Sequence, residues 1–134
     1  MKKITTTKTT KTIRTKPKAP AAPDIGLWLV KLCREAAEDK KAEDIVVLDM
    51  RKVSTLADYL MICSGGSEPH VRTIADEIVY QAREQGVRPK SRDGSPKSRW
   101  MVVDYGDVMI HVMHPELREH YALESLWGDA KRVK

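Results

Sequence analysis

The stretch from Arg99 to Met113 constrains the possible folds more than any other part of this chain. It holds two runs of mostly β-branched and other apolar residues, which flank Tyr105-Gly106. This pattern is typical of an antiparallel hairpin, because glycine tolerates the positive φ that a tight turn needs. With Tyr105-Gly106 as the loop, Trp100 is expected opposite His111. The sequence therefore predicts a sheet that contains this hairpin.

Alternating side chains divide such a hairpin into two faces. One face is uniformly apolar and belongs against a core, and it comprises Met101, Val103, Val108, Ile110 and Val112. The other comprises Trp100, Val102, Asp104, Asp107, Met109 and His111. This second face is too polar for a core and too apolar to meet only water, which makes it a candidate docking surface. The alternative is that a helix or loop of the same chain covers it, since most large apolar side chains are buried.

The remaining pattern predicts one α/β domain over residues 24–130, a disordered basic tail at 1–23 and a short basic end at 131–134. Helices are expected from Asp24, as N-cap, to residue 40, from Ser67, as N-cap, to Gly86, and in short segments at 115–118 and 121–127. Strands are expected at residues 45–48, 59–63 and 87–90, with a polar connection at 91–98. Because the hairpin is antiparallel, the sheet must be mixed.

Charge is concentrated at the N-terminus. Residues 1–23 carry seven basic and no acidic side chains, so subtracting +7 from the overall +5 leaves −2 for the rest of the chain. A segment with almost nothing to bury is expected to be disordered. It could lie on RNA phosphates, where basic groups release counterions. A targeting peptide is less well matched, because the segment has one arginine and no apolar stripe, and a solubilising extension is the third interpretation.

Two further features bear on the cellular setting. Cys33 and Cys63 lack the spacing of a disulfide framework or a zinc site, which indicates a reducing compartment. No apolar run is long enough to span a membrane, so we expect a soluble, cytoplasmic protein without a membrane partner.

The sequence contains no recognisable catalytic centre. Asp104 and Asp107 face each other across the turn, but no further acid repeats nearby to complete a metal site. The Gly65-Gly66-Ser67 turn before a helix could cradle a phosphate. Glu68 at that helix start already satisfies the dipole and repels a second anion. We therefore expect no enzyme, no metal and no cofactor.

Several stretches, taken in this order, resemble the ribosomal silencing factor family, also called Iojap-like proteins: Lys41–Asp49, Leu56–Ile62, Gly65-Gly66-Ser67 with His70-Val71, Trp100, Val102–Asp107, Ile110–Val112, Arg118, Tyr121, Leu123-Glu124 and Leu126-Trp127. The resemblance runs from about residue 24 to residue 130. It implies a fold related to the nucleotidyltransferase core, without that core's catalytic acids.

The resemblance also implies a function without chemistry. It implies binding to the large ribosomal subunit at its protein number fourteen, on the face that meets the small subunit. The two subunits then cannot join, and translation is lowered when nutrients are scarce. Organellar relatives are implied to assist maturation of the large subunit.

This family gives the second hairpin face a candidate partner. Trp100 is expected as the apolar anchor, with Val102, Met109 and His111 beside it. Tyr59 and Met61 are expected to join them if the alternation of their strand is in phase. Lys97 and Arg99 are expected to form a polar rim.

Two alternatives belong to other classes. An active nucleotidyltransferase would use the Gly65-Gly66-Ser67 turn for a triphosphate and would need an Asp-x-Asp pair on a central strand, which the sequence does not show. A free homodimer could form through the same apolar face and compete with ribosome binding.

Overall fold

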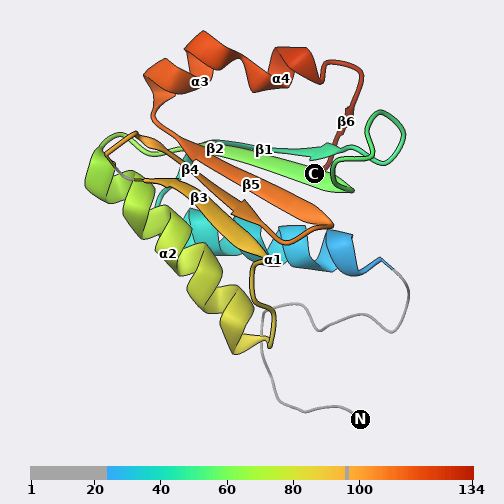
Figure 1. Cartoon of the computed structure of the whole chain (residues 1–134), viewed down its shortest axis with the longest axis horizontal. Coiled ribbons are helices and arrows are strands. Elements are labelled where there is room, and N and C mark those ends of the chain that lie inside the picture. The colour runs from blue at the N-terminus through green and yellow to red at the C-terminus, as the bar shows by residue number, and fades with distance from the viewer. Residues whose placement is uncertain (1–23, 96) are drawn as a thin grey trace.

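The computed structural model describes residues 24–95 and 97–134, and the predictions made for residues 1–23 lie outside this part. Two long helices, α1 (Ile25–Asp39) and α2 (Glu68–Glu84), cover one face of a β-sheet (Figure 1). Two short helices, α3 (Pro115–Tyr121) and α4 (Leu123–Leu126), lie on the opposite face (Figure 1). The layers are therefore helix, sheet and helix.

The sheet has six strands in the described residues, in the order β3-β4-β5-β2-β1-β6. They are β1 (Glu43–Asp49), β2 (Tyr59–Ser64), β3 (Ser91–Ser95), β4 (Trp100–Asp104), β5 (Val108–Met113) and β6 (Lys131–Arg132). Strands β2 and β5 pair in parallel, whereas the other neighbours pair antiparallel. The predicted α/β class with a mixed sheet flanked by helices is confirmed.

The turn between β4 and β5 lies one residue later than predicted. Its two central residues are Gly106 and Asp107, since the amide of Tyr105 donates to the carbonyl of Val108 at 2.8 Å. Gly106 takes a φ of 88° at the first central position, where this kind of tight hairpin turn favours glycine. The side chain of Asp104 accepts a 2.7 Å hydrogen bond from the Gly106 amide. The expected loop Tyr105-Gly106 is therefore wrong by one residue.

This correction changes the partners across the hairpin and leaves its faces intact. Trp100 lies opposite Met113, and His111 lies opposite Val102. Each cross-strand pair is shifted by two residues from the predicted one. Because side chains alternate with a period of two, a shift of two returns every strand residue to the same face. Asp107, expected on the second face, instead lies in the turn, so that placement is wrong.

The larger core lies between the sheet and helices α1 and α2. It contains all five residues of the predicted apolar hairpin face: Met101, Val103, Val108, Ile110 and Val112. A smaller cluster lies on the other face and comprises Leu48, Met50, Leu60, Ile62 and Met113. Burying apolar surface on both faces is what an internal strand such as β2 requires.

The ends of the long helices follow the sequence signals. Asp24 accepts a hydrogen bond from the Leu27 amide at 3.0 Å, and Ser67 accepts one from the His70 amide at 3.2 Å. Both predicted N-caps are confirmed. Gly86, with a φ of 84°, follows the last residues of α2 in the left-handed conformation common after a helix.

The edge strands differ from the predictions. Residues 91–95 form β3, whereas the expected strand was 87–90, so that placement is wrong. The β3 side chains are largely exposed and polar, with Arg92 paired to Asp76 of α2 at 3.0 Å. An exposed edge strand lacks the apolar alternation by which a strand is recognised.

The C-terminal residues also join the sheet. Lys131 and Arg132 form β6 against Asp49 and Leu48 of β1. The amide of Val133 donates to the carbonyl of Val47 at 2.8 Å. Within the described residues, no helix has the length and apolar character to cross a membrane.

Candidate docking surface

Four residues of β4 and β5 form a partly exposed patch on the face opposite α1 and α2. These are Trp100, Val102, Met109 and His111, which are called the Trp100 surface below. The neighbouring strand β2 contributes Leu60 and Ile62 to the same face, paired with Met109 and His111. The structure therefore brings together the four hairpin residues that the sequence proposed as the centre of the site.

Trp100 is held by a hydrogen bond within the Trp100 surface. Its indole Nε1–H donates to Nδ1 of His111 at 3.0 Å, and the two ring centroids are 5.9 Å apart. Burial lowers the pKa of His111 to about 4, because the charged imidazolium loses its hydration. His111 is therefore neutral at neutral pH, with Nδ1 free of a proton to accept this bond.

Tyr121, the last residue of α3, extends the Trp100 surface. Its ring centroid lies 4.9 Å from that of Trp100, with the planes tilted by 46°. The side chain of His120 contacts the Tyr121 ring edge-on, also at 4.9 Å. Tyr121 is 51% exposed, so its ring both contacts Trp100 and remains accessible to a partner. The sequence gives no sign that Tyr121 belongs to the site, because a short helix carries no signal of where it lies on a sheet.

Helices α3 and α4 cover another part of the same face. Leu117, Leu123 and Trp127 pack against the cluster of Leu48, Leu60 and Ile62. A segment of the same chain covers the side formed by β1 and β2, whereas the side formed by β4 and β5 stays partly exposed.

Tyr59 and Met61 do not belong to this surface. Tyr59 pairs with Val108 and Met61 with Ile110, which places both in the core beneath α1 and α2. Their exposed fractions are 2% and 0%. The alternation of β2 is therefore out of phase with the expectation, and the proposed contact role of these two residues is wrong. All six residues of β2 are buried, so its sequence carries no sign of which face is which.

The two predicted rim residues precede β4. Lys97 is exposed, in the turn that leads from β3 into β4. Arg99, directly before Trp100, takes a φ of 62° and forms an ion pair with Glu116 of α3 at 3.1 Å. The carbonyl of Arg99 also accepts a hydrogen bond from the His114 amide at 2.9 Å. Arg99 thus links the start of β4 to the start of α3.

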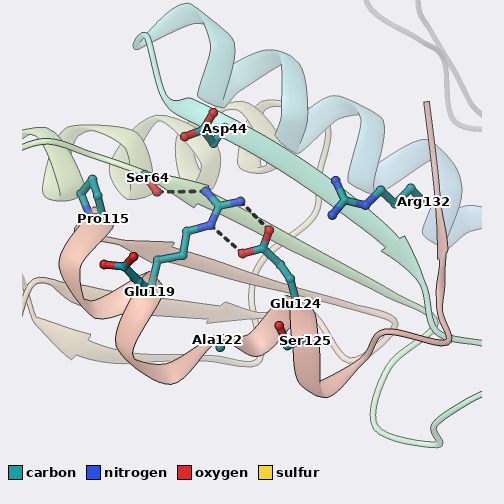
Figure 2. A pocket seen from close by; sticks show the side chains of 9 residues that line it. Asp44, Ser64, Pro115, Glu119, Ala122, Glu124, Ser125 and Arg132 are labelled. Carbon is teal, nitrogen blue, oxygen red and sulfur yellow. Dashed lines mark hydrogen bonds and ion pairs between the residues drawn. The ribbon is translucent and has the colours of Figure 1, made fainter.

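An open pocket lies between the α3–α4 turn and the ends of β1 and β2 (Figure 2). Arg118 crosses it and is 8% exposed. Its Nε donates to one carboxylate oxygen of Glu124 at 2.8 Å and its Nη2 to the other at 3.2 Å. Its Nη1 donates to Oγ of Ser64 at 2.9 Å (Figure 2). The Arg118 guanidinium holds the pKa of the Glu124 carboxyl below its usual range.

Two amides of the glycine turn before α2 are hydrogen-bonded within the chain. The Gly65 amide donates to the Met113 carbonyl at 3.1 Å, and the Gly66 amide donates to Nδ1 of His70 at 3.0 Å. These two amides are the groups that a phosphate cradle would present to its ligand. Glu68 also stands in the first turn of α2, as the sequence indicated. In the described residues, no three His, Cys, Asp or Glu side chains gather in a way that could hold a metal ion.

The fold and this surface define a small α/β protein with a mixed sheet, one face of which is partly exposed and carries a tryptophan. Residues 23–134 match the family described as ribosomal silencing factor during starvation. The chain belongs to this family, as the sequence resemblance predicted.

Comparisons with individual proteins agree with that assignment. The chain is 48% identical over 102 residues to the ribosomal silencing factor of Bacillus subtilis, a match that covers 76% of this chain and 86% of that protein. It is similar to a crystal structure of a Chromobacterium violaceum protein, with a TM-score of 0.72 and 37% identity over 75% of this chain and 83% of the other. A mouse relative is 33% identical over 102 residues, covering 74% of this chain and 43% of its own length. It is named mitochondrial assembly of ribosomal large subunit protein 1.

Proposed function

We propose that this protein silences ribosomes by steric exclusion. It binds the large ribosomal subunit at protein number fourteen through the Trp100 surface, and the bound factor occupies space that the small subunit needs. Translation is thereby repressed under nutrient limitation. The observation that carries the proposal is a partly exposed tryptophan, oriented by His111 and Tyr121, on a sheet face of a ribosomal silencing factor.

The Trp100 surface has the features of a binding hot spot. Trp and Tyr are enriched among the residues that dominate binding energy, because they bury a large area with few rotatable bonds. Both rings are already held in place in the free protein, which lowers the entropic cost of docking. Lys97 and Arg99 supply positive charge at the rim, although Arg99 also pairs with Glu116.

The mechanism requires occupancy and no chemical step. A factor that binds separate subunits but not the joined ribosome shifts the equilibrium toward separate subunits by mass action. The family is named for regulation, and the amides of the glycine turn are used within the chain. These observations support a binding protein, which we propose acts in the cytoplasm, over the alternative of an active nucleotidyltransferase.

Two further contacts are part of the proposal. Residues 1–23, with seven basic and no acidic side chains, bind ribosomal RNA phosphates near the docking site. In the absence of ribosomes, the same apolar surface supports a homodimer, which competes with ribosome binding. Light scattering over a range of protein concentrations tests the dimer.

The central experiment mixes purified large and small subunits under conditions that favour joining, with increasing amounts of the protein. Sedimentation should show joined ribosomes decreasing while the protein sediments with the large subunit. If the subunits join equally well at saturating protein, the proposal is wrong. A protein that sediments with the small subunit instead would also overturn it.

A second candidate function is assembly of the large subunit. The name of the mouse relative favours it. Depletion of the protein from growing cells would then accumulate incomplete large subunits during rapid growth. Under the silencing proposal, the effect of depletion should instead appear during starvation.

A further inference from the structure

The junction between α3 and α4 depends on an unusual backbone conformation at Ala122. This alanine takes a φ of 47° and a ψ of 49°, and it is both the C-cap residue of α3 and the N-cap residue of α4. Side chains disfavour the left-handed region, because Cβ approaches the following carbonyl oxygen. The turn must therefore be held by contacts from outside it.

Arg118 supplies contacts on both sides of this turn. It lies on α3, its fork reaches Glu124 on α4, and its remaining bond reaches Ser64 at the end of β2 (Figure 2). The carbonyl of Arg118 also accepts the Ala122 amide at 2.9 Å. A paired donor fork of this kind fixes direction as well as distance. One nearly buried side chain thus joins α3, α4 and the sheet.

The position of Tyr121 follows from the same turn. Tyr121 directly precedes Ala122, and its ring lies 4.9 Å from Trp100. The ring also contacts His120 and is 51% exposed. Relaxing the Ala122 turn would change the backbone at the end of α3, and with it the direction in which the Tyr121 side chain points. The larger core beneath α1 and α2 contains none of these residues, so it need not change.

We propose that Arg118 is a positioning residue for docking: by binding Glu124 and Ser64 it holds the α3–α4 turn, and thereby keeps Tyr121 against Trp100 in the geometry that a partner contacts. This inference rests on the proposed function, since it assigns a role within the same surface. Arg118 itself is nearly buried and does not contact the partner.

The test uses Arg118→Met, which keeps an apolar stem and removes the fork. Affinity for the large subunit should fall roughly tenfold, because the surface loses its preorganisation. Tyr121→Ala should weaken binding by a similar factor. The double variant, Arg118→Met with Tyr121→Ala, should lose at most about twofold more affinity than the single variant with the larger loss. This is because the effects of residues that act through one another are not additive. Arg83→Met is the matched control, since Arg83 lies over the Tyr80 ring on α2, and it should bind normally.

A second measurement uses the free protein. In a ¹H–¹⁵N spectrum, the indole signal of Trp100, assigned with Trp100→Phe, should move in Arg118→Met in the same direction as in Tyr121→Ala. If Arg118→Met does not fold, Glu124→Gln replaces it, because the amide keeps the size of the side chain and removes its charge. The same direction of shift is expected.

Different failures have different meanings. If Tyr121→Ala weakens binding and Arg118→Met does not, the positioning role is wrong and the docking surface stands. If the effects of the two changes multiply, Arg118 acts other than through Tyr121, and the inference is overturned. If Trp100→Ala, Tyr121→Ala and Arg118→Met all bind normally, the docking surface itself is wrong.

Discussion

The indole N–H of Trp100 donates a 3.0 Å hydrogen bond to Nδ1 of His111 on the neighbouring strand, although the two residues are not direct cross-strand partners. Trp100 lies opposite Met113 and His111 opposite Val102, so the bond runs diagonally over the sheet. A diagonal contact is within reach of long aromatic side chains. The hydrogen bond therefore links the protonation state of His111 to the orientation of Trp100.

The burial of His111 predicts that the free energy of unfolding depends on pH between about 6.5 and 4. The pKa of His111 is lowered to about 4 in the folded protein, so over this range the unfolded chain takes up a proton that the folded chain does not. The free energy of unfolding should therefore fall as pH falls, by up to about 3 kcal/mol from this group, and the contribution is fully present above pH 6.5. Urea unfolding at several pH values measures it. His111→Gln should flatten the curve in this range, and an unchanged slope would contradict the assignment.

Truncation of the anchor should weaken docking strongly. Trp100→Ala removes the indole, and we expect binding to the large subunit to weaken by about 2 kcal/mol or more, as for other buried aromatic anchors. Quantitative co-sedimentation measures the loss. Tyr80→Ala is the matched control, because Tyr80 is a 45% exposed aromatic residue on α2, on the other side of the sheet. Equal affinities for a folded Trp100→Ala variant and the parent protein would exclude this surface.

The hairpin turn gives a prediction about stability. Gly106 has a φ of 88°, so Gly106→Ala should destabilise the protein by about 1 kcal/mol from backbone strain alone. An added Cβ would also lie 2.9 Å from Nζ of Lys90, whose side chain can move away. Gly66→Ala is the control, since no atom lies within 4 Å of its added Cβ. Thermal unfolding of both variants measures the difference, and equal melting temperatures would count against the assigned turn.

The basic N-terminal segment gives a prediction about salt. If its seven basic side chains contact RNA phosphates, binding to the large subunit should weaken steeply with salt. Removing residues 1–23 should then reduce the slope of log affinity against log salt by up to about six. Binding isotherms at several salt concentrations measure the slope. Identical slopes for both proteins would leave the segment without a role in RNA binding.

Much of the fold could be predicted from local patterns. Alternation in residues 100–112 gave the correct hairpin faces, even though the loop was misplaced by one residue, because a register error of two residues preserves every face. The caps Asp24 and Ser67 were also correct, since a cap bonds an amide only three residues away. These features depend on neighbours in the chain.

The errors lie where a segment's environment comes from distant residues. The expected strand at 87–90 is wrong because β3 has exposed, polar side chains, and its pairing with β4, not its own pattern, makes it a strand. The expected face of Tyr59 and Met61 is wrong because β2 is buried on both sides and either phase fits its sequence. No pattern in the sequence indicates that Tyr121 lies against Trp100.

Sequence alone was sufficient to establish the family, the mixed α/β sheet and a hairpin with one apolar face and one face that is only partly so. The tertiary structure was needed to show which strands lie beside that hairpin, how far α3 and α4 cover it, and that Arg118 joins them to β2. The physical reason is one of range. Alternation and capping act between residues a few positions apart, whereas the pairing of β2 with β5 and the bond from Arg118 to Ser64 join residues about fifty positions apart, as the 54-residue separation of that last pair illustrates.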